Sequence, residues 1–528
     1  MPDNALIQGL MKPDIYQHDT QAIRLVETHC AWVILTGAYA YKLKKPVNFG
    51  FLDFSTLEKR KFYCEEELRL NQRFAAAIYL DVVAITGTAE NPQIAGKNQV
   101  LEYAVRMRQF PDNLLLSQLA SRQALKTVHI DQLIDIVSDF HRHAARSGNE
   151  DNFGTPANTH HWIQENFQHI QPLLTSVAEK ADIALLRDWS ETAYTRLIPV
   201  MQQRKQTGAI RECHGDLHLG NITLINDRVT PFDCIEFNPD LRWIDVVSEI
   251  AFVLMDLDER GLHGYAHRFL NGYLQQTGDY SGLQLLPYYQ AYRAMVRAKV
   301  AKLRGQQTRP GDTGHARAES EYRNYLQLAL RYTTRNRPVM VIMRGLSGSG
   351  KSTVARDLCE QTGMIQLRSD VERKRAAGLA ATDASQSAPG KGLYSADKTA
   401  DTYQQLAALA QSVLQAGYSA VIDATFLKQE QRDLFRSQAA ASGTPFLIIE
   451  CSAPGEELER RILARQAGRQ DPSEATLEVL HAQQATDEPL SAAEKPYLLR
   501  ADTLSTNNKG LHGAFLHWLT SKAGDTGL

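Results

Sequence analysis

The 528-residue sequence lacks cysteine pairs, an excess of basic charge and long hydrophobic runs. Its six cysteines include no C-x-x-C pair, which argues against a disulfide framework and a thiolate zinc site, and predicts a reducing, cytoplasmic location. The formal net charge of −2 provides no overall basic field, so we expect no specific nucleic-acid partner.

No segment of the sequence indicates a membrane. The longest apolar runs, such as residues 250–255, are far shorter than the roughly 20 residues of a membrane-spanning helix. The N-terminus lacks the basic and then apolar pattern of a signal peptide. Hydrophobic residues at 43% and charged residues at 22% are typical of a folded soluble protein, and this length predicts two or three domains. The sequence does not indicate an oligomeric state.

A glycine-rich segment follows the apolar run that begins at Val339. Its pattern, Gly345-x4-Gly350-Lys351-Ser352, predicts a buried strand, a phosphate loop and a helix start, because glycines let backbone N–H groups approach an anion. Lys351 would supply charge to the outer phosphates of ATP and Ser352 a hydroxyl to Mg²⁺. An ordinary Gly/Ser loop is the alternative. The expected nucleotide-binding residues are Gly345, Leu346, Ser347, Gly348, Ser349, Gly350, Lys351, Ser352 and Thr353.

The first 110 residues predict a small antiparallel sheet with one helix. Residues 30–36 and 38–44 are β-rich runs joined at Gly37, which is a hairpin pattern, and residues 79–85 and 99–106 predict further strands. A helix is expected over residues 56–74.

Lys42 and Lys44 share one face of the second strand, and the helix carries Glu65, Glu66 and Glu67. A strand lysine paired with a helix glutamate holds the α- and β-phosphates of ATP in protein kinases. Surface lysines and glutamates without such a role are the alternative.

Residues 110–335 show mainly helical spacing of apolar residues, as over 130–143. The helical pattern is interrupted at residues 213–222, which contain His-Gly-Asp and then, five positions after the Asp, an Asn. Asp216 and Asn221 have the spacing of a kinase catalytic loop, and a short hairpin leads to Asp233. We therefore expect Asp216 to accept the proton of an acceptor hydroxyl, and Asn221 and Asp233 to hold Mg²⁺.

This segment resembles the aminoglycoside phosphotransferase branch of the kinase-like fold, over roughly residues 20–330. The resemblance implies Asp216 as base, Asn221 and Asp233 as metal ligands, and Lys42 with Glu67 as the phosphate-positioning pair, with Lys44 as the alternative lysine. It implies a domain over residues 1–335, with a small lobe to about residue 110 and a helical lobe over 111–335. The turn at Gly37 departs from the kinase pattern because it lacks G-x-G-x-x-G.

Two further patterns favour structural roles. His214 and His218 lie four positions apart, but without the intervening glutamate of a zinc motif, so we expect loop histidines. The pair His141 and His143 is expected at the surface or in packing. Residues 288–303 form a basic amphipathic pattern, which predicts a packed helix more than a site for an acidic partner or a membrane surface.

Residues 336–528 alternate strand and helix patterns, which predicts a mainly parallel sheet with ligands at the carboxyl ends of its strands. The second strand is expected to end in Ser369-Asp370, the third in Asp423, and a fourth covers residues 445–451. Ser352, Asp370 and Asp423 would then meet at one edge of the sheet. Asp423 is expected to hold the Mg²⁺ water, and Asp370 to face an acceptor.

This arrangement resembles the small P-loop kinases and zeta-toxin-like enzymes. The resemblance implies Asp370 as base and Arg368 and Arg373 as substrate contacts. Residues 383–398 predict a mobile loop over the acceptor. Three arginines recur every four residues on one helical face, which predicts a lid that brings charge to the transferring phosphate or else a solvated face. These are Arg461, Arg465 and Arg469.

The whole chain resembles bacterial proteins that fuse the two types of domain, with a short junction at residues 335–338. The fold class expected is multidomain α+β and α/β: an N-terminal protein-kinase-like bilobal fold and a C-terminal P-loop NTPase with a mainly parallel sheet. The function expected is ATP-dependent phosphoryl transfer to the hydroxyl of a small molecule. The alternative is an ATP-binding regulatory or slow ATPase module with a pseudokinase N-terminal half.

Overall fold

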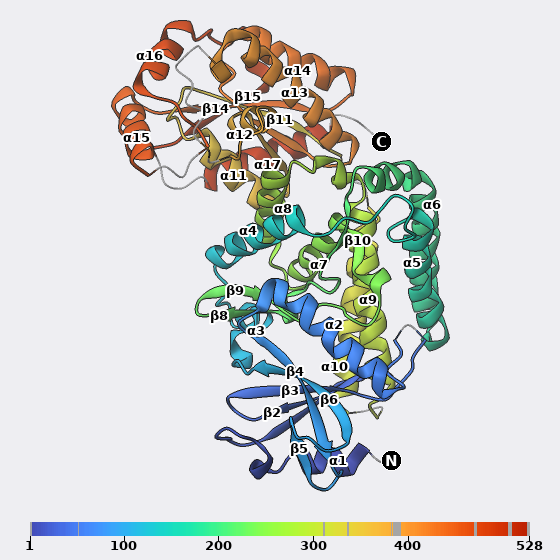
Figure 1. Cartoon of the computed structure of the whole chain (residues 1–528). Coiled ribbons are helices and arrows are strands. Elements are labelled where there is room, and N and C mark those ends of the chain that lie inside the picture. Colours follow the sequence, from blue (N-terminus) through green and yellow to red (C-terminus); the bar gives the residue numbers. More distant parts are fainter. Residues whose placement is uncertain are drawn as a thin grey trace. The chain divides into compact units, whose positions relative to one another are not determined.

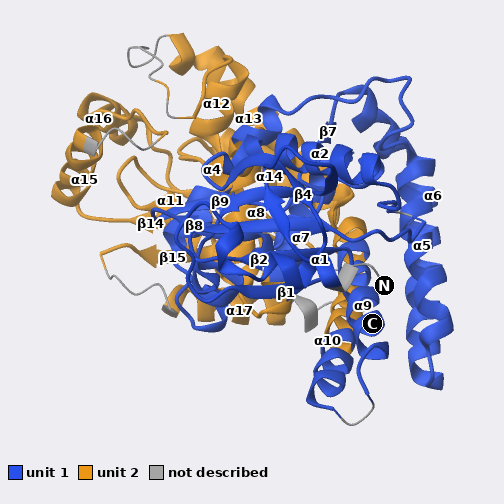
Figure 2. Cartoon of the chain, turned by 60° about the horizontal axis from the view of Figure 1, so that its bottom comes forward, with its two compact units in different colours: residues 1–133, 139–256, 292–322 blue, residues 134–138, 257–291, 323–528 orange. Residues whose placement is uncertain are grey.

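The structure is a computed structural model that forms two compact units, coloured in Figure 2. The first unit comprises residues 1–133, 139–256 and 292–322, and the second comprises residues 134–138, 257–291 and 323–528. Residues 257–291 precede the expected junction, yet they pack with the phosphate-loop part of the chain. The residues that the structure describes are 3–50, 52–309, 312–334, 337–381, 383, 392–468, 472–504 and 509–524.

The first unit begins with a six-stranded sheet in the order β1-β2-β3-β6-β4-β5, with every neighbouring pair antiparallel. The expected hairpin is present, and helix α2 (Leu57–Ala75) packs on β4 and β6. Two short strands, β1 and β5, were not predicted, because each has too few residues for a recognisable alternation. The strands are β1 Arg24–Glu27, β2 Ala31–Leu35, β3 Tyr39–Lys44, β4 Tyr79–Gly87, β5 Pro92–Ile94 and β6 Val100–Arg108.

Helices make up most of the remaining first unit, and their starts follow from local sequence. Helix α6 (Val177–Gln206) begins at a capping box, in which Ser176 and Glu179 satisfy each other's backbone N–H groups. The predicted hairpin after the His-Gly-Asp segment is formed by β8 (Ile222–Ile225) and β9 (Arg228–Pro231). A second pair joins β7 (Ile210–Glu212) to β10 (Trp243–Asp245).

Some of the remaining helices contain residues of both units. The basic pattern at residues 288–303 lies in α9, whose Arg293 is buried, so the expectation of a packed helix is confirmed. The helices are α1 Asp3–Leu10, α3 Leu116–Ser121, α4 Thr127–His143, α5 Pro156–Ile170, α7 Val246–Glu259, α9 Leu286–Gln306 and α10 Thr313–Arg331.

The second unit contains a parallel five-stranded sheet in the order β12-β13-β11-β14-β15. Its central strands are buried on both faces and therefore read as continuous apolar runs rather than as alternation. The fifth strand, β15, was missed because it is partly exposed and includes the charged residues Arg500 and Asp502, so it does not read as an apolar run. The strands are β11 Met340–Arg344, β12 Ile365–Arg368, β13 Ala420–Asp423, β14 Phe446–Ser452 and β15 Leu498–Asp502.

Helices cover both faces of this sheet. Helix α11 (Lys351–Thr362) and helix α17 (Lys509–Gly524) share one apolar core with the sheet, and α13 and α14 pack on the sheet from the other side (Figure 1). Helix α8 (His263–Thr277) packs on α11. The other helices are α12 Ser369–Ala376, α13 Ala396–Gln415, α14 Gln429–Ala441, α15 Gly455–Gly468 and α16 Leu477–Thr486.

All six cysteines are free thiols, and five of them are buried. Among the described residues, no helix combines the length and hydrophobicity needed to cross a bilayer.

Candidate active sites

The phosphate loop connects the carboxyl end of β11 to the start of α11. Gly345, Gly348 and Gly350 all have positive φ, which side chains disfavour. A Cβ atom on Gly348 would lie 2.7 Å from the carbonyl oxygen of Leu458, so this loop needs glycine for space as well as for conformation. Its backbone can therefore approach an anion closely at the helix start.

Lys351 is 8% exposed and folds back over the loop. Its Nζ donates to the carbonyl oxygen of Leu346 at 2.7 Å and to Ser349 Oγ at 3.4 Å. Burial lowers the pKa of Lys351, while Asp423 and Asp370 oppose that shift. The two carboxylates therefore lie close enough to Lys351 to form one electrostatic cluster with it.

Asp423, at the end of β13, forms the acidic centre of this cluster. Its Oδ2 accepts a hydrogen bond from Gln366 Nε2 at 3.0 Å, and Ser352 also hydrogen-bonds to the carboxylate. Burial raises the pKa of Asp423, and nearby Arg368 opposes that shift. A hydroxyl and a carboxylate are hard oxygen donors of the kind that Mg²⁺ prefers, so Ser352 and Asp423 fit this ion.

Asp370 lies in the first turn of α12 rather than in a strand, because β12 ends at Arg368. The prediction that this strand includes Ser369 and Asp370 is therefore wrong. A helix start is a favourable place for a carboxylate because the helix dipole is positive there. Asp370 Oδ1 accepts from Arg373 at 3.3 Å, and the Arg373 guanidinium lies 4.8 Å from the centre of the Tyr394 ring.

These residues line one cavity of about 570 Å³, which is within the range of about 300–1,000 Å³ typical of ligand sites. The structure thus brings together groups that are distant in sequence. From the predicted set, the lining includes Ser347, Gly348, Gly350, Lys351, Ser352, Thr353, Arg368, Asp370, Arg373, Asp423, Arg461 and Arg465. Gly345, Leu346 and Ser349 are in the same loop but do not line the cavity.

The arginines of α15 differ in their contacts. Arg461 donates to the carbonyl oxygens of Gly348, at 3.3 Å, and Thr503, at 2.8 Å, so it ties the phosphate loop to the end of β15. Arg465 also lines the cavity, where it donates to the carbonyl oxygen of Ala475 at 3.3 Å. Arg469 lies outside the described residues.

The expected mobile segment at residues 383–398 is only partly described, because residues 384–391 lie outside the described chain. Of its last residues, 392–394 form a 3₁₀ turn, and Ala396 begins α13. The hydroxyl of Tyr394 donates to Glu474 at 3.4 Å beside the cavity. Residues 335 and 336 of the expected junction also lie outside the described chain.

The first unit holds a second group of predicted residues, built around Glu67. Lys42 Nζ donates to Glu67 at 2.8 Å and to Asp233 at 2.6 Å. Lys44 donates to the other oxygen of Glu67 at 2.7 Å and pairs with Glu236. Both lysines on the strand face therefore bind Glu67, and Lys42 is the one that reaches Asp233.

Burial and charge separate the two lysines. The Lys44 side chain is 1% exposed, whereas Lys42 is 14% exposed and Asp233 is 41% exposed. Burial alone would raise the pKa of Glu67, but both lysines lower it to about 2. The open end of the network is thus Lys42 with Asp233, and the closed end is Lys44 with Glu236.

Asp216 lies in the loop before β8, where Asn221 Nδ2 donates to its carboxylate at 2.9 Å and to its carbonyl oxygen at 3.0 Å. Burial alone would raise the pKa of Asp216, but nearby His218 and Arg297 lower it. The carboxylate therefore stays ionised, as a proton acceptor requires. His218 Nδ1 accepts from the backbone N–H of Gly220 at 3.0 Å, so His218 is a loop histidine as expected.

His214 links the Asp216 loop to the Asp233 segment. Its Nε2 donates to the carbonyl oxygen of Phe232 at 2.8 Å, and its Nδ1 accepts from the N–H of Asp216 at 3.3 Å. Burial lowers the pKa of His214 to about 4, so the ring is neutral at pH 7. Asp233 has φ +64, a conformation that the adjoining contacts must support.

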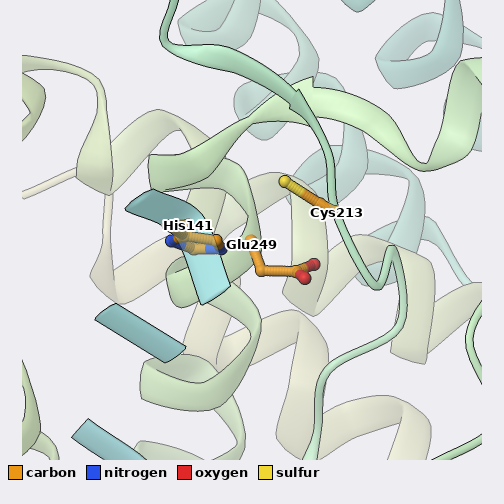
Figure 3. Close-up of side chains that lie close together, drawn as sticks. All are labelled: His141, Cys213 and Glu249. Carbon is orange, nitrogen blue, oxygen red and sulfur yellow. The ribbon is translucent and has the colours of Figure 1, made fainter. Parts of the chain in front are cut away.

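Glu249 of α7 holds the same loop from behind, because its two oxygens accept from the N–H groups of His214 and Gly215 at 2.6 and 2.9 Å. Figure 3 shows that it lies close to His141 and Cys213, all buried. These ligand atoms are close enough for a metal ion, but the carboxylate already accepts two loop hydrogen bonds and Cys213 Sγ donates to Ile244 O at 3.7 Å. This cluster fits an anchor for the loop. His141 is buried and His143 is exposed, which agrees with the expectation that these histidines lie in packing or at the surface.

Sequence reasoning missed several polar residues of both sites. Glu236 follows Asp233 by three residues and Glu249 follows Asp245 by four, yet one sequence gives no reason to select either carboxylate. Gln366 lies inside an apolar strand, where a lone amide is a recognisable signal because a buried polar group needs partners.

Comparison with known proteins supports two kinase-like parts. Residues 61–286 match the Phosphotransferase enzyme family, and residues 340–490 match a model described as AAA domain. Uncharacterized proteins of Mycobacterium tuberculosis and Mycobacterium bovis are 28% identical over 467 residues, which is 88% of this chain and 91% of theirs. An alignment of that length extends over both matched regions.

Solved structures also align with parts of the chain. A choline/ethanolamine kinase family protein from Mesorhizobium loti has 10% identity and a TM-score of 0.35, covering 62% of this chain and 99% of its own. The APS kinase of Mycobacterium tuberculosis has 24% identity and a TM-score of 0.25, covering 35% and 98%. The two family matches show that this chain joins a phosphotransferase-family domain to a P-loop kinase-like domain and is an ATP-dependent kinase or phosphotransferase.

Proposed function

We propose that the P-loop part of the chain transfers the terminal phosphate of ATP to a hydroxyl group of a small molecule. The observation that carries this proposal is the shared cavity, which brings Lys351, Asp370 and Arg465 together. The phosphate loop would bind the phosphates of ATP through its backbone N–H groups, and Lys351 would contact the outer ones. Ser352 and Asp423 would hold Mg²⁺, which when bound neutralises phosphate charge.

Asp370 is the proposed base of this reaction. Its carboxylate would take the proton of the acceptor hydroxyl while the acceptor oxygen bonds to the terminal phosphorus and the bond from that phosphorus to ADP breaks. Arg465 would stabilise the charge on the phosphoryl group in transit. Arg373 would keep the Asp370 carboxylate oriented through the hydrogen bond already described.

The competing function is slow ATP hydrolysis without an acceptor. The cavity favours a kinase because it extends from the loop to Tyr394, Thr399 and Tyr403, where a small molecule can lie beside Asp370. Labelled ATP and a panel of hydroxyl compounds would identify the acceptor. With that acceptor, Asp370→Asn should lower turnover strongly, whereas Asp401→Asn, a matched change at a 72% exposed carboxylate on α13, should not. Full turnover by Asp370→Asn would overturn the assignment of the base.

We further propose a second phosphotransferase site in the first unit, with Asp216 as base. This site is supported by a complete set of side chains: Lys42 on Glu67 and Asp233, and Asn221 on Asp216. Lys42 and Glu67 would position the phosphates of ATP, and Asn221 and Asp233 offer oxygens that fit Mg²⁺. A pseudokinase is the alternative.

The second site can be tested in the full chain with the P-loop inactivated by Lys351→Ala, since residues 257–291 pack with the second unit and a cut at residue 335 would expose them. Calorimetry should then still detect ATP binding with Mg²⁺. Adding Asp216→Asn should remove phosphoryl transfer, and Asp188→Asn, at a 75% exposed carboxylate, should leave it unchanged. Absence of ATP binding in the Lys351→Ala protein would identify a pseudokinase.

A further inference from the structure

Helix α8 belongs to one part of the chain by sequence and to the other by packing. It lies within residues 61–286, which match the phosphotransferase family, yet it belongs to the second unit, where it packs on α11 (Figure 1) and also on β12. Its polar contacts with the P-loop part are specific. His267 Nδ1 lies 2.8 Å from the carbonyl oxygen of Glu360, and Arg268 pairs with the Glu360 carboxylate at 2.5 Å.

Asn271 of α8 hydrogen-bonds to the backbone at the outer edge of β12. Its Nδ2 donates to the carbonyl oxygen of Met364 at 3.0 Å, and its Oδ1 accepts from the N–H of Gln366 at 2.8 Å. Because β12 is the edge strand of its sheet, these backbone groups have no neighbouring strand on that side. The Asn271 amide therefore supplies the pair of bonds that another strand would make, and it fixes the backbone at Gln366.

The side chain of Gln366 continues the connection into the active site. Its Nε2 donates to Asp423 Oδ2 at 3.0 Å and to the carbonyl oxygen of Ser352 at 3.5 Å. Its Oε1 accepts from Gln275 of α8 at 3.3 Å. A carboxylate only accepts hydrogen bonds, so the NH₂ end of the amide must face Asp423, and Gln275 satisfies the opposite end. Gln366 is 4% exposed, so water cannot readily replace these partners.

A second set of contacts joins the end of α8 and the turn after it to α12, the helix that begins with Ser369-Asp370. Tyr280 donates to Glu372 at 3.0 Å, and Arg375 bonds to both oxygens of Glu372 at 2.8 Å. Arg375 also donates to the carbonyl oxygen of Gln275. The same short segment of the chain thus holds α12, which carries Asp370, and β12, whose Gln366 binds Asp423.

We infer that α8 is a positioning part of the P-loop site: Asn271 and Gln275 orient Gln366, and Gln366 orients the Asp423 carboxylate beside Ser352. This inference rests on the proposed metal role of Ser352 and Asp423, and it adds positioning residues from outside the P-loop sequence. A helix from the segment that matches the phosphotransferase family therefore positions residues of the P-loop site.

The test measures metal binding in the full-length protein, using Mn²⁺ as the probe in the presence of a non-hydrolysable ATP analogue. Every variant would also carry Lys42→Met and Asp233→Asn, which disable the proposed site of the first unit. The Mn²⁺ signal then reports the P-loop site. Gln366→Met keeps the length of the side chain but removes the amide, so Mn²⁺ affinity should fall about 10- to 100-fold, as when partners of metal ligands are removed. Binding of the analogue without metal should stay the same, because the phosphate loop is intact.

Gln275→Met should produce a smaller loss of Mn²⁺ affinity in the same assay, since Gln366 keeps its bond to Asp423 but loses the partner that fixes its orientation. Gln276→Ala is the matched control: it removes one hydrogen bond on the same helix, from Gln276 to Asp135 at 2.6 Å, away from β12. Control and parent should bind Mn²⁺ equally.

Two results would overturn the inference. One is unchanged Mn²⁺ affinity in Gln366→Met; the other is an equal loss of metal-dependent and metal-free analogue binding together with a lower Tm, which would indicate general packing. Neither result depends on finding an acceptor. A failure of the proposed phosphoryl transfer would therefore be seen separately, as a protein that binds nucleotide and metal but phosphorylates nothing.

Discussion

The two candidate sites differ in how their charges are satisfied. In the first unit, Lys42 pairs with Glu67 and Asp233, and Lys44 pairs with Glu67 and Glu236, so both lysines already have carboxylate partners. In the second unit, Lys351 donates to a carbonyl oxygen of its own loop, beside an open cavity. A ligand must therefore compete with existing ion pairs in the first site, but only with a hydrogen bond to an uncharged carbonyl oxygen in the second.

Replacing Lys44, at the closed end of the Glu67 network in the first unit, should have the largest effect on stability. Lys44→Met leaves two buried carboxylates, on Glu67 and Glu236, without this cation, and breaking a buried pair in this way costs about 3–5 kcal/mol. Urea unfolding should show this loss. Lys42→Met at the more exposed end should cost less, and an equal loss for both variants would contradict the distinction between a closed and an open end.

A change at Lys351 in the P-loop site should affect activity much more than stability. Lys351→Ala removes the only lysine that lines the described part of the P-loop cavity, and it should lower phosphoryl transfer by this site about 100- to 1,000-fold, as the loss of one transition-state contact does. Steady-state kinetics with the identified acceptor would measure it. The free energy of unfolding should hardly fall, because burial already disfavours the charged amine. A large loss of stability would show that this lysine is structural, like Lys44.

Acid should weaken the first unit through His141, a buried group behind the Asp216 loop. Burial lowers the pKa of His141 from 6.5 to about 3, so the unfolded chain binds a proton that the folded chain does not between these values. Stability should therefore fall as the pH drops below 6.5, by about 1.4 kcal/mol per pH unit from this group. Unfolding curves between pH 6.5 and 5 would measure the slope, and His141→Gln should reduce it. An unchanged slope in that variant would remove His141 from the explanation.

The smallest effect is expected from Arg460, which lies on the same helix as two arginines of the P-loop cavity but does not line that cavity. Arg460 is on α15 beside Arg461, but its side chain is 69% exposed and pairs with Glu457 at the surface. Arg460→Ala should hardly change stability and should leave turnover unchanged, because a surface ion pair contributes little. Arg465→Ala should lower turnover. Similar kinetics for the two variants would show that contact with the cavity does not decide which arginine of α15 matters for turnover.

Local patterns in the sequence were sufficient for most of the fold. The loop glycines, the alternating strands and helices of the second unit, and the hairpin that leads to Asp233 all depend on nearby residues. The error at Ser369-Asp370 arose because a strand and the helix after it share one polar stretch, and only backbone hydrogen bonds show that α12 begins at Ser369.

The partners within each site were harder to predict, because they depend on contacts between distant residues. Lys42 and Lys44 occupy one strand face in the sequence pattern, and only the positions of Asp233 and Glu236 distinguish them. Likewise, nothing in the sequence of α8 indicates that Asn271 binds β12 nearly one hundred residues later. The roles of Asp216, Asp370 and Arg465 remain proposals.

The bonds from Asn271 to β12 have a consequence for solubility. An uncovered edge strand can pair with the edge of another molecule, which promotes aggregation. A fragment that begins at residue 337 would lack α8 and leave the N–H of Gln366 and the carbonyl of Met364 open at that edge. Expressed alone, such a fragment should self-associate, whereas one that begins before α8 keeps its edge covered.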